Sequence, residues 1–125
     1  MAVARSLFVS LDCADPTPLA EFWAAMLGGE IRFRTATTVG VRTDWVWLTA
    51  MAVPDYEPPT WPTAEVPKQV HLDLAVDDLD AAIAEAERLG ATLAAIQPVP
   101  NRRRILLDPA GHPFCLTTQI PPEAQ

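Results

Sequence analysis

The sequence predicts an α+β fold made of two tandem β-α-β-β-β modules. In each half of the chain, a segment of alternating apolar residues, typical of a strand, precedes a segment with helical spacing. Three short strand candidates follow each predicted helix, so this order repeats with a period of about half the chain. The length of 125 residues suits one ordinary domain. We therefore expect a curved sheet of mixed and antiparallel strands around a cavity, with the helices outside.

The first module is expected over about residues 5–50. Apolar residues alternate over Leu7–Cys13, which predicts a strand. Asp15 and the prolines that follow it are typical of a helix start, and Gly28 is typical of a helix end. Trp23 belongs to the apolar stripe of this helix and is expected in the core. Three strands are then predicted over residues 31–35, 38–42 and 45–50.

The second module is expected over about residues 70–119 and repeats the first. His71–Val76 alternates like a strand, Asp77 and Asp78 supply caps for a helix, and Gly90 ends that helix. Strands are predicted over residues 92–96, 103–107 and 114–118, with a turn at Asp108–Gly111.

The two modules are joined by a predicted linker, residues 51–69, in which five prolines prevent regular strand pairing. A linker of this length is usually functional or loosely ordered, and Trp61 within it is consistent with either a lid or a dimer arm. Phe8–Asp15 aligns with His71–Asp78. Because neither module alone buries enough apolar surface, we expect them to share a core as one domain, residues 1–125.

Each predicted strand has an aliphatic face for the helices and an opposite face of mixed character. The opposite face combines aromatic side chains with polar and titratable ones, as small-molecule cavities do. A ligand, the other module or a partner subunit would have to cover this face. We expect the following residues to bind the ligand, together with Trp61 from the linker: Phe8, Ser10, Asp12, Trp45, Trp47, Cys115 and Thr117.

His71 and Asp73 are the candidate catalytic residues. They lie two positions apart on a strand and so share a face, where a carboxylate-held imidazole can act as a general base. The alternative is a hydrogen-bonded pair without catalysis. Cys115 is interpreted as an apolar filler rather than a nucleophile. Zinc bound by these three residues, with or without Asp12, is a further hypothesis. Cys13 falls on the helix-facing side, so no disulfide with Cys115 is expected.

Charge and composition exclude several classes of partner. The formal net charge of −7 argues against nucleic acid, because an acidic surface repels phosphates. The longest uncharged apolar stretch, Trp45–Pro54, is too short to cross a membrane, and no signal peptide is expected at the N-terminus. Two cysteines form no disulfide framework, which favours a cytoplasmic location. The run Arg102–Arg104 is interpreted as a solvated strand or hairpin edge.

Several motifs together resemble the vicinal oxygen chelate superfamily, which includes glyoxalase I, extradiol dioxygenases, fosfomycin-resistance enzymes and the bleomycin resistance protein. The resemblance covers nearly the whole chain and implies the glyoxalase-like fold; homodimers are common in the superfamily, so one is expected here. Pro58–Pro62 also resembles the corresponding segment of small glyoxalase-like domain proteins. The motifs are Phe22-Trp23 with Leu27-Gly28, His71-Leu72-Asp73-Leu74 with Asp78-Leu79, Leu89-Gly90-Ala91, and Asp108 through Leu116.

Metal-using members of the resembled superfamily take four ligands from the first and last strands of each half. These positions correspond to Phe8, to a residue near Trp47 or Thr49, to His71 and to Cys115. Phe8 cannot bind a metal, and Cys115 places a thiol where a glutamate is usual. We therefore expect no cofactor; if a divalent metal does bind, His71 and Cys115 are the expected ligands.

Three functions follow as hypotheses. The leading one is metal-independent binding of a small molecule, with sequestration and resistance, as in the bleomycin resistance protein, as its biological use. The second is a lyase, isomerase or hydrolase that uses His71 and Asp73, with or without a divalent metal. The third is a dimeric accessory module without a ligand. Whether the chain is an enzyme is left open, and binding without turnover is favoured.

Overall fold

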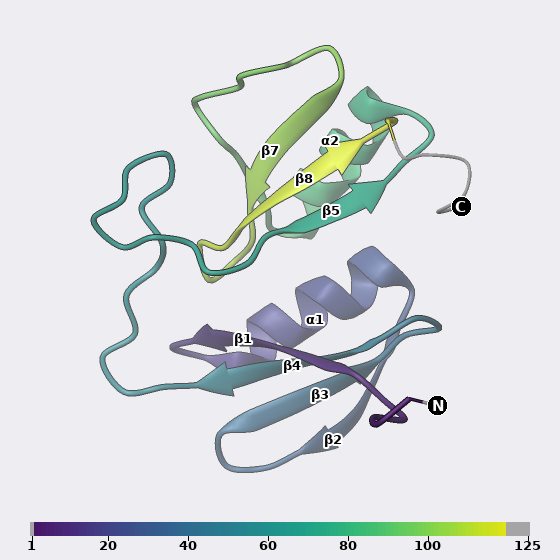
Figure 1. Ribbon diagram of the computed structural model, residues 1–125, viewed down its shortest axis with the longest axis vertical. Helices are drawn as coiled ribbons and strands as arrows, with labels where there is room; N and C mark the ends of the chain where they lie inside the picture. Colours follow the sequence, from purple (N-terminus) through teal and green to yellow (C-terminus); the bar gives the residue numbers. More distant parts are fainter. Residues whose placement is uncertain (1, 120–125) are drawn as a thin grey trace. The chain divides into compact units, whose positions relative to one another are not determined.

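The computed structural model describes residues 2–119, and the chain divides into two compact units. Unit 1 is Met1–Glu57 and unit 2 is Pro58–Gln125. Among the described residues, each unit holds one helix and one four-stranded sheet. Figure 1 labels the helix and the longer strands of each unit. The predicted α+β class with two tandem β-α-β-β-β modules is therefore confirmed.

Unit 1 contains β1 (Phe8–Cys13), α1 (Pro16–Leu27), β2 (Glu30–Arg34), β3 (Thr38–Arg42) and β4 (Trp47–Ala52). Its strands lie in the order β1-β4-β3-β2. β1 pairs with β4 in parallel, and the other two pairings are antiparallel, so the sheet is mixed.

Unit 2 contains β5 (Leu72–Ala75), α2 (Leu79–Leu89), β6 (Thr92–Leu93), β7 (Arg103–Leu107) and β8 (Pro113–Thr117). The order β5-β8-β7-β6 repeats that of unit 1, again with one parallel pairing, between β5 and β8. The internal repeat seen in the sequence is thus a repeat of topology as well.

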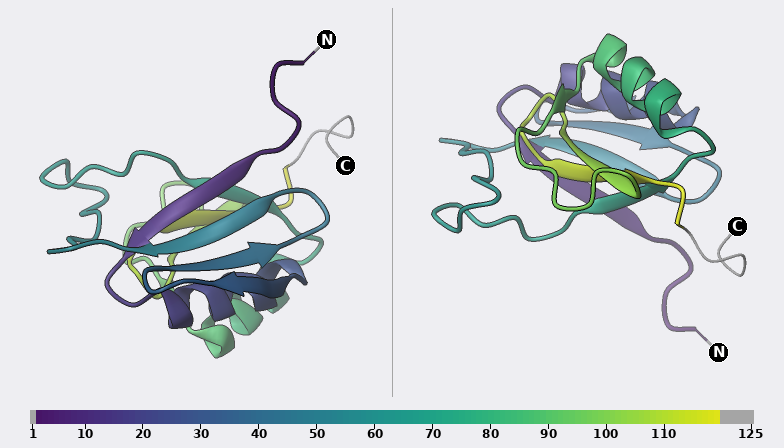
Figure 2. Two further views of the ribbon diagram at one scale, coloured as in Figure 1. Left: turned by 90° about the horizontal axis from the view of Figure 1, so that it is seen from below. Right: turned by 90° about the horizontal axis from the view of Figure 1, so that it is seen from above.

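Both helices begin and end where local chemistry predicts. The Asp15 carboxylate accepts a hydrogen bond from the Thr17 amide at 3.2 Å, and the Asp78 carboxylate accepts one from Ala81 at 3.0 Å. Gly28 closes α1 in the left-handed region at φ 64°, which glycine adopts without strain. Figure 2 shows α1 lying along one face of its sheet.

Each helix covers one face of its own sheet and forms the core there. In unit 1, Trp23 is 1% exposed, as predicted, in the layer between α1 and strands β3 and β4. In unit 2, α2 packs on β6, β7 and β8. The opposite sheet faces are therefore free to carry polar and aromatic groups. The buried residues of these two cores include Leu19, Phe22, Val41, Leu48 and Ala50 in unit 1, and Ile83, Ala86, Leu106, Phe114 and Leu116 in unit 2.

The last strand of unit 1, β4, starts later than the predicted residue 45, and Trp45 therefore lies outside the sheet. The Thr43 hydroxyl accepts hydrogen bonds from the amides of Trp45 and Val46 and donates one to the Val46 carbonyl. These bonds fix a turn, so β4 begins at Trp47 and continues to Ala52, inside the range expected for the linker. Trp45 lies in the turn and is 76% exposed.

The strand that follows α2 in unit 2, β6, is shorter than the predicted residues 92–96. β6 ends at Leu93 instead of reaching Ile96. The Gln97 side chain explains this, because its amide donates to the carbonyls of Ala94 and Ile105 and accepts from the Ile105 amide, at 2.8–2.9 Å. A side chain thus satisfies the groups that a longer strand would have paired.

Two further observations concern the chain as a whole. Within residues 2–119, no helix combines the length and apolarity needed to cross a membrane. Cys13 and Cys115 are both buried, and neither is part of a disulfide.

Candidate functional site

The open face of the sheet in unit 1 carries an aromatic strip, defined here as Phe8, Trp47 and Phe33. Phe8 and Trp47 are paired in register across β1 and β4, and their rings stack with centroids 5.4 Å apart. Phe33 of β2 lies 6.1 Å from Trp47, across Gly40 of β3. Phe8 is 50% exposed and Phe33 is 38% exposed. The strip is therefore only partly covered within unit 1.

The polar residues predicted on this face lie beside the aromatic strip. The Ser10 hydroxyl is 2.5 Å from the Thr49 hydroxyl, its partner in register on β4. Asp12 is exposed and lies opposite Met51. Phe8, Ser10, Asp12 and Trp47 thus share one face, as predicted.

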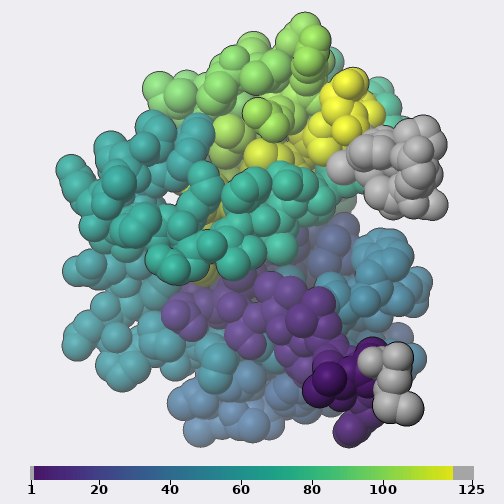
Figure 3. All heavy atoms as spheres, viewed as in Figure 1, coloured from purple at the N-terminus to yellow at the C-terminus, as the bar shows by residue number. Residues whose placement is uncertain are grey.

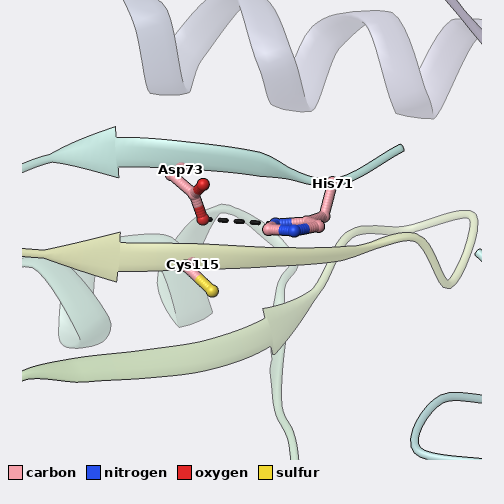
Figure 4. Close-up of side chains that lie close together, drawn as sticks. All are labelled: His71, Asp73 and Cys115. Carbon is pink, nitrogen blue, oxygen red and sulfur yellow. Dashed lines mark ion pairs between the residues drawn. The ribbon is translucent and has the colours of Figure 1, made fainter.

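Unit 2 brings together His71, Asp73 and Cys115 (Figure 4). The imidazole and carboxylate point toward each other, with Nδ1 of His71 3.2 Å from Oδ1 of Asp73. Cys115 projects from β8, where it pairs in register with Asp73 of β5. One potential metal-binding atom from each residue lies within 4.8 Å of the others. Both His71 and Asp73 remain about half exposed.

The Cys115 thiol is held in its protonated form. Burial raises its pKa above the ordinary thiol value, and the neighbouring Asp73 carboxylate raises it further. The positive charges of Arg103 and Lys68 oppose this shift more weakly. Because the thiolate is the nucleophilic form, Cys115 is a poor nucleophile at neutral pH.

A pocket of about 230 Å³ lies beside this cluster, entirely within unit 2. Trp61 forms part of its wall and packs against the buried cluster of Ala94, Ile105 and Cys115. Figure 3 shows the linker (teal) and the loop that precedes β7 (green) side by side on the surface; both contribute to the lining. The lining includes Trp61, Lys68, His71, Arg103, Ile105 and Cys115, and is completed by Phe114 and two prolines.

The predicted site residues therefore fall into two groups, one in each unit. Trp61, His71, Asp73 and Cys115 meet at or beside the pocket of unit 2. Thr117 shares the face of β8 with Cys115 but is outside the lining. Its hydroxyl donates to the Arg102 carbonyl at 3.3 Å and accepts from the Gln119 amide at 3.0 Å.

Two cationic residues of the pocket were missed by the sequence analysis, Lys68 and Arg103. Lys68 belongs to the linker and places its ammonium group 5.5 Å from the ring centroid of Trp61. Arg103 is on β7, two residues before Ile105, and so faces the pocket with it. The only sequence signal was the run Arg102–Arg104, which does not say which of its members faces a cavity.

Comparison with known proteins defines the class to which this chain belongs. Residues 8–117 match the family model described as a glyoxalase-like domain. The chain therefore belongs to the glyoxalase-like domain family, within the vicinal oxygen chelate superfamily that the sequence motifs resemble. No curated protein matches the sequence directly.

Solved structures share the fold at low sequence identity. The fosfomycin resistance protein FosX from Mesorhizobium loti superimposes with a TM-score of 0.70 at 15% identity, over 99% of this chain and 98% of that one. A mutant FosX from Listeria monocytogenes, in complex with Mn(II) and 1S,2S-dihydroxypropylphosphonic acid, gives 0.69 at 14%, over 96% and 93%. The bleomycin-binding protein from Streptomyces verticillus, in complex with copper(II)-bleomycin, gives 0.59 at 21%, over 96% and 100%.

The residues of this chain do not fit the metal site that the superfamily implies. In unit 1, the positions equivalent to His71 and Cys115 hold Phe8, which has no ligand atom, and Thr49, whose hydroxyl is hydrogen-bonded to Ser10. Within residues 2–119, the group of donors close enough together to hold a metal is His71, Asp73 and Cys115 of unit 2, a mixed nitrogen, oxygen and sulfur set that suits zinc better than manganese. To bind zinc, the Cys115 thiol would have to lose its proton, and the Asp73 carboxylate would have to leave its contact with His71.

Proposed function

We propose that this protein binds a small organic molecule in the pocket of unit 2, without a metal ion, and acts by sequestering that molecule. The observation that carries the proposal is the lining of the pocket, where the Trp61 ring and Ile105 adjoin an imidazole and two cations. Apolar walls with a few placed polar groups are typical of ligand sites.

The chemistry of the cluster favours binding over turnover. Cys115 has a raised thiol pKa and so lacks the thiolate needed for covalent catalysis. Asp73 directs its carboxylate toward His71 and adjoins the thiol, which orders the polar edge of the pocket. The bleomycin-binding protein offers a structural analogy for sequestration; its likeness is one of fold.

A fragment screen with chelator-treated protein would test the proposal. We expect ligand-observed NMR to detect fragments whose signals are lost in the Trp61→Ala variant. Trp45→Ala is the matched control, because it removes an exposed indole from a turn in unit 1. Thermal unfolding of each variant would separate lost binding from lost folding, since Trp61 also packs on the core.

Two results would contradict the proposal. The first is that no fragment binds the folded protein. The second is that fragments bind equally well to the wild type and to folded Trp61→Ala, which would place binding outside this pocket. Binding that requires added metal would contradict the metal-independent part alone.

The pairing of His71 with Asp73 supports a second candidate function, a lyase, isomerase or hydrolase with His71 as general base. The Nδ1–Oδ1 distance of 3.2 Å allows the carboxylate to orient the imidazole beside the pocket. A turnover activity that is lost in His71→Ala and reduced in Asp73→Asn would establish it.

The cytoplasmic location and the homodimer stay predictions. Cell fractionation would test the first, and analytical ultracentrifugation would test the second.

A further inference from the structure

We infer that the pocket of unit 2 selects a small anionic ligand, whose carboxylate or phosphonate lies between Lys68 and Arg103 and whose apolar part lies against Trp61. This inference rests on the proposed binding function and specifies the class of molecule bound. It follows from the charge of the lining, from the placement of the two cations and from the size of the pocket.

The charge of the lining is opposite to that of the chain. The protein has sixteen acidic and nine basic residues, with a net charge of −7. Nevertheless, Lys68 and Arg103 both line the pocket, and among residues 2–119 no aspartate or glutamate does. A concave site lined by one sign of charge attracts ligands of the other sign.

The two cations are available to a ligand. Within the described part of the chain, neither Lys68 nor Arg103 forms an ion pair with a carboxylate. Lys68 interacts instead with the face of Trp61, which leaves its ammonium hydrogens free to donate to an anion. Arg103 offers a planar guanidinium that matches carboxylate and phosphonate geometry.

Register separates Arg103 from its neighbours in the basic run. Arg103 pairs with Thr117 and Ile105 with Cys115, so both β7 residues lie on the pocket face. Arg104 pairs with Leu116 and faces the helix side, while Arg102 precedes the strand. The influence of Lys68 and Arg103 on the Cys115 thiol agrees with their position around one pocket.

The remaining polar groups set where the anion lies. Asp73 adjoins Cys115 outside the lining and would repel an anion placed close to it. The anionic group is therefore expected on the side of Lys68 and Arg103.

The volume of the pocket limits the size of the ligand. The volume of about 230 Å³ is below the roughly 300–1,000 Å³ of sites for drug-sized ligands, so the ligand is the size of an aryl or short alkyl acid.

Four probes that share one ring test the charge preference. Phenylacetate is anionic, phenylacetamide is neutral, phenethylamine is cationic, and phenylphosphonate carries more negative charge. Titrations would be followed by NMR and calorimetry at low and moderate salt. We expect the two anions to bind about ten- to a hundred-fold more tightly than the amide, with the difference shrinking as salt rises.

Variants then assign the preference to the two cations. Arg103→Gln and Lys68→Gln should each weaken phenylacetate binding about ten-fold while leaving phenylacetamide binding within about two-fold. Arg102→Gln is the matched control, because it removes the same charge from the same basic run outside the pocket. Circular dichroism and thermal unfolding would verify that every variant is folded.

The outcomes distinguish this inference from the function on which it rests. If phenylacetamide or phenethylamine binds as tightly as phenylacetate, or if Arg102→Gln weakens phenylacetate binding as much as Arg103→Gln, the anion site is wrong and the pocket remains a binding site. If none of the four probes binds and the fragment screen is also negative, both proposals are wrong.

Discussion

Ser10 and Thr49 face each other across the parallel strands β1 and β4, with their hydroxyl oxygens 2.5 Å apart. Asp73 and Cys115 face each other in the same way across β5 and β8. The two pairs are equivalent in the internal repeat, because Phe8–Asp15 aligns with His71–Asp78. Ser10 and Thr49 are two neutral hydroxyl groups. Asp73 and Cys115 are a carboxylate and a thiol, and the His71 imidazole lies beside them. Of these two equivalent pairs, the titratable one is thus in unit 2.

This asymmetry predicts the metal content of the protein. We expect protein purified without chelator or affinity metal to hold no stoichiometric metal, and to take up none from zinc, manganese, iron(II), nickel or cobalt. The reason is that unit 1 offers the Phe8 ring and the Thr49 hydroxyl where ligands would be needed, and that the Cys115 thiol of unit 2 would have to lose its proton to bind a metal. Elemental analysis measures this. Stoichiometric metal that is lost in His71→Ala but kept in Ser10→Ala would contradict the prediction and establish a metal centre in unit 2.

The Cys115 thiol provides a prediction about pH. Its raised pKa means that the rate of alkylation by iodoacetamide should reach half its maximum above the pH expected for an ordinary thiol. Asp73→Asn should move this midpoint down, because a negative charge that disfavours the thiolate is removed. Arg103→Gln should move it up, because a favourable positive charge is removed.

Peptide-level mass spectrometry would separate Cys115 from the buried Cys13 in these measurements. Asp77→Asn serves as the control, since Asp77 is exposed and is not among the groups that shift this thiol. A midpoint that does not respond to Asp73→Asn, or that moves in the same direction in both variants, would contradict the assigned causes.

The packing of the Phe33 ring over Gly40 predicts that Gly40→Ala destabilises the protein. A Cβ at Gly40 would lie 2.1 Å from Cε1 of Phe33, so Gly40→Ala must displace the ring and its contact with Trp47. We expect a loss of about 1–3 kcal/mol in the free energy of unfolding, measured by urea denaturation. In a Phe33→Ala background the same substitution should cost less, with a coupling energy of at least about 0.5 kcal/mol. Equal costs in the two backgrounds would show that the ring is not the obstacle.

The sequence by itself determined the two modules and their helices, because the signals for them are local. Asp15 and Asp78 cap the helices through bonds to amides two and three residues away, and apolar spacing decides which helix face is buried. The same reasoning put Phe8 and Trp47 on one sheet face, since strand alternation has a fixed period. His71, Asp73 and Cys115 were identified as neighbours for this reason together with the resemblance to a known superfamily.

Only the tertiary structure decided what lies around that cluster. Trp45 left the sheet because the Thr43 hydroxyl forms a turn, a competition between side-chain and backbone hydrogen bonds that alternation does not reveal. Lys68 and Trp61 reach the pocket from a proline-rich linker, which has no periodicity to assign a direction. Arg103 faces the pocket because of the register of β7 on β8, and a shift of one residue would have presented Arg104 instead. The positive charge of the pocket is thus a property of strand register and linker path, which depend on contacts between residues far apart in the sequence.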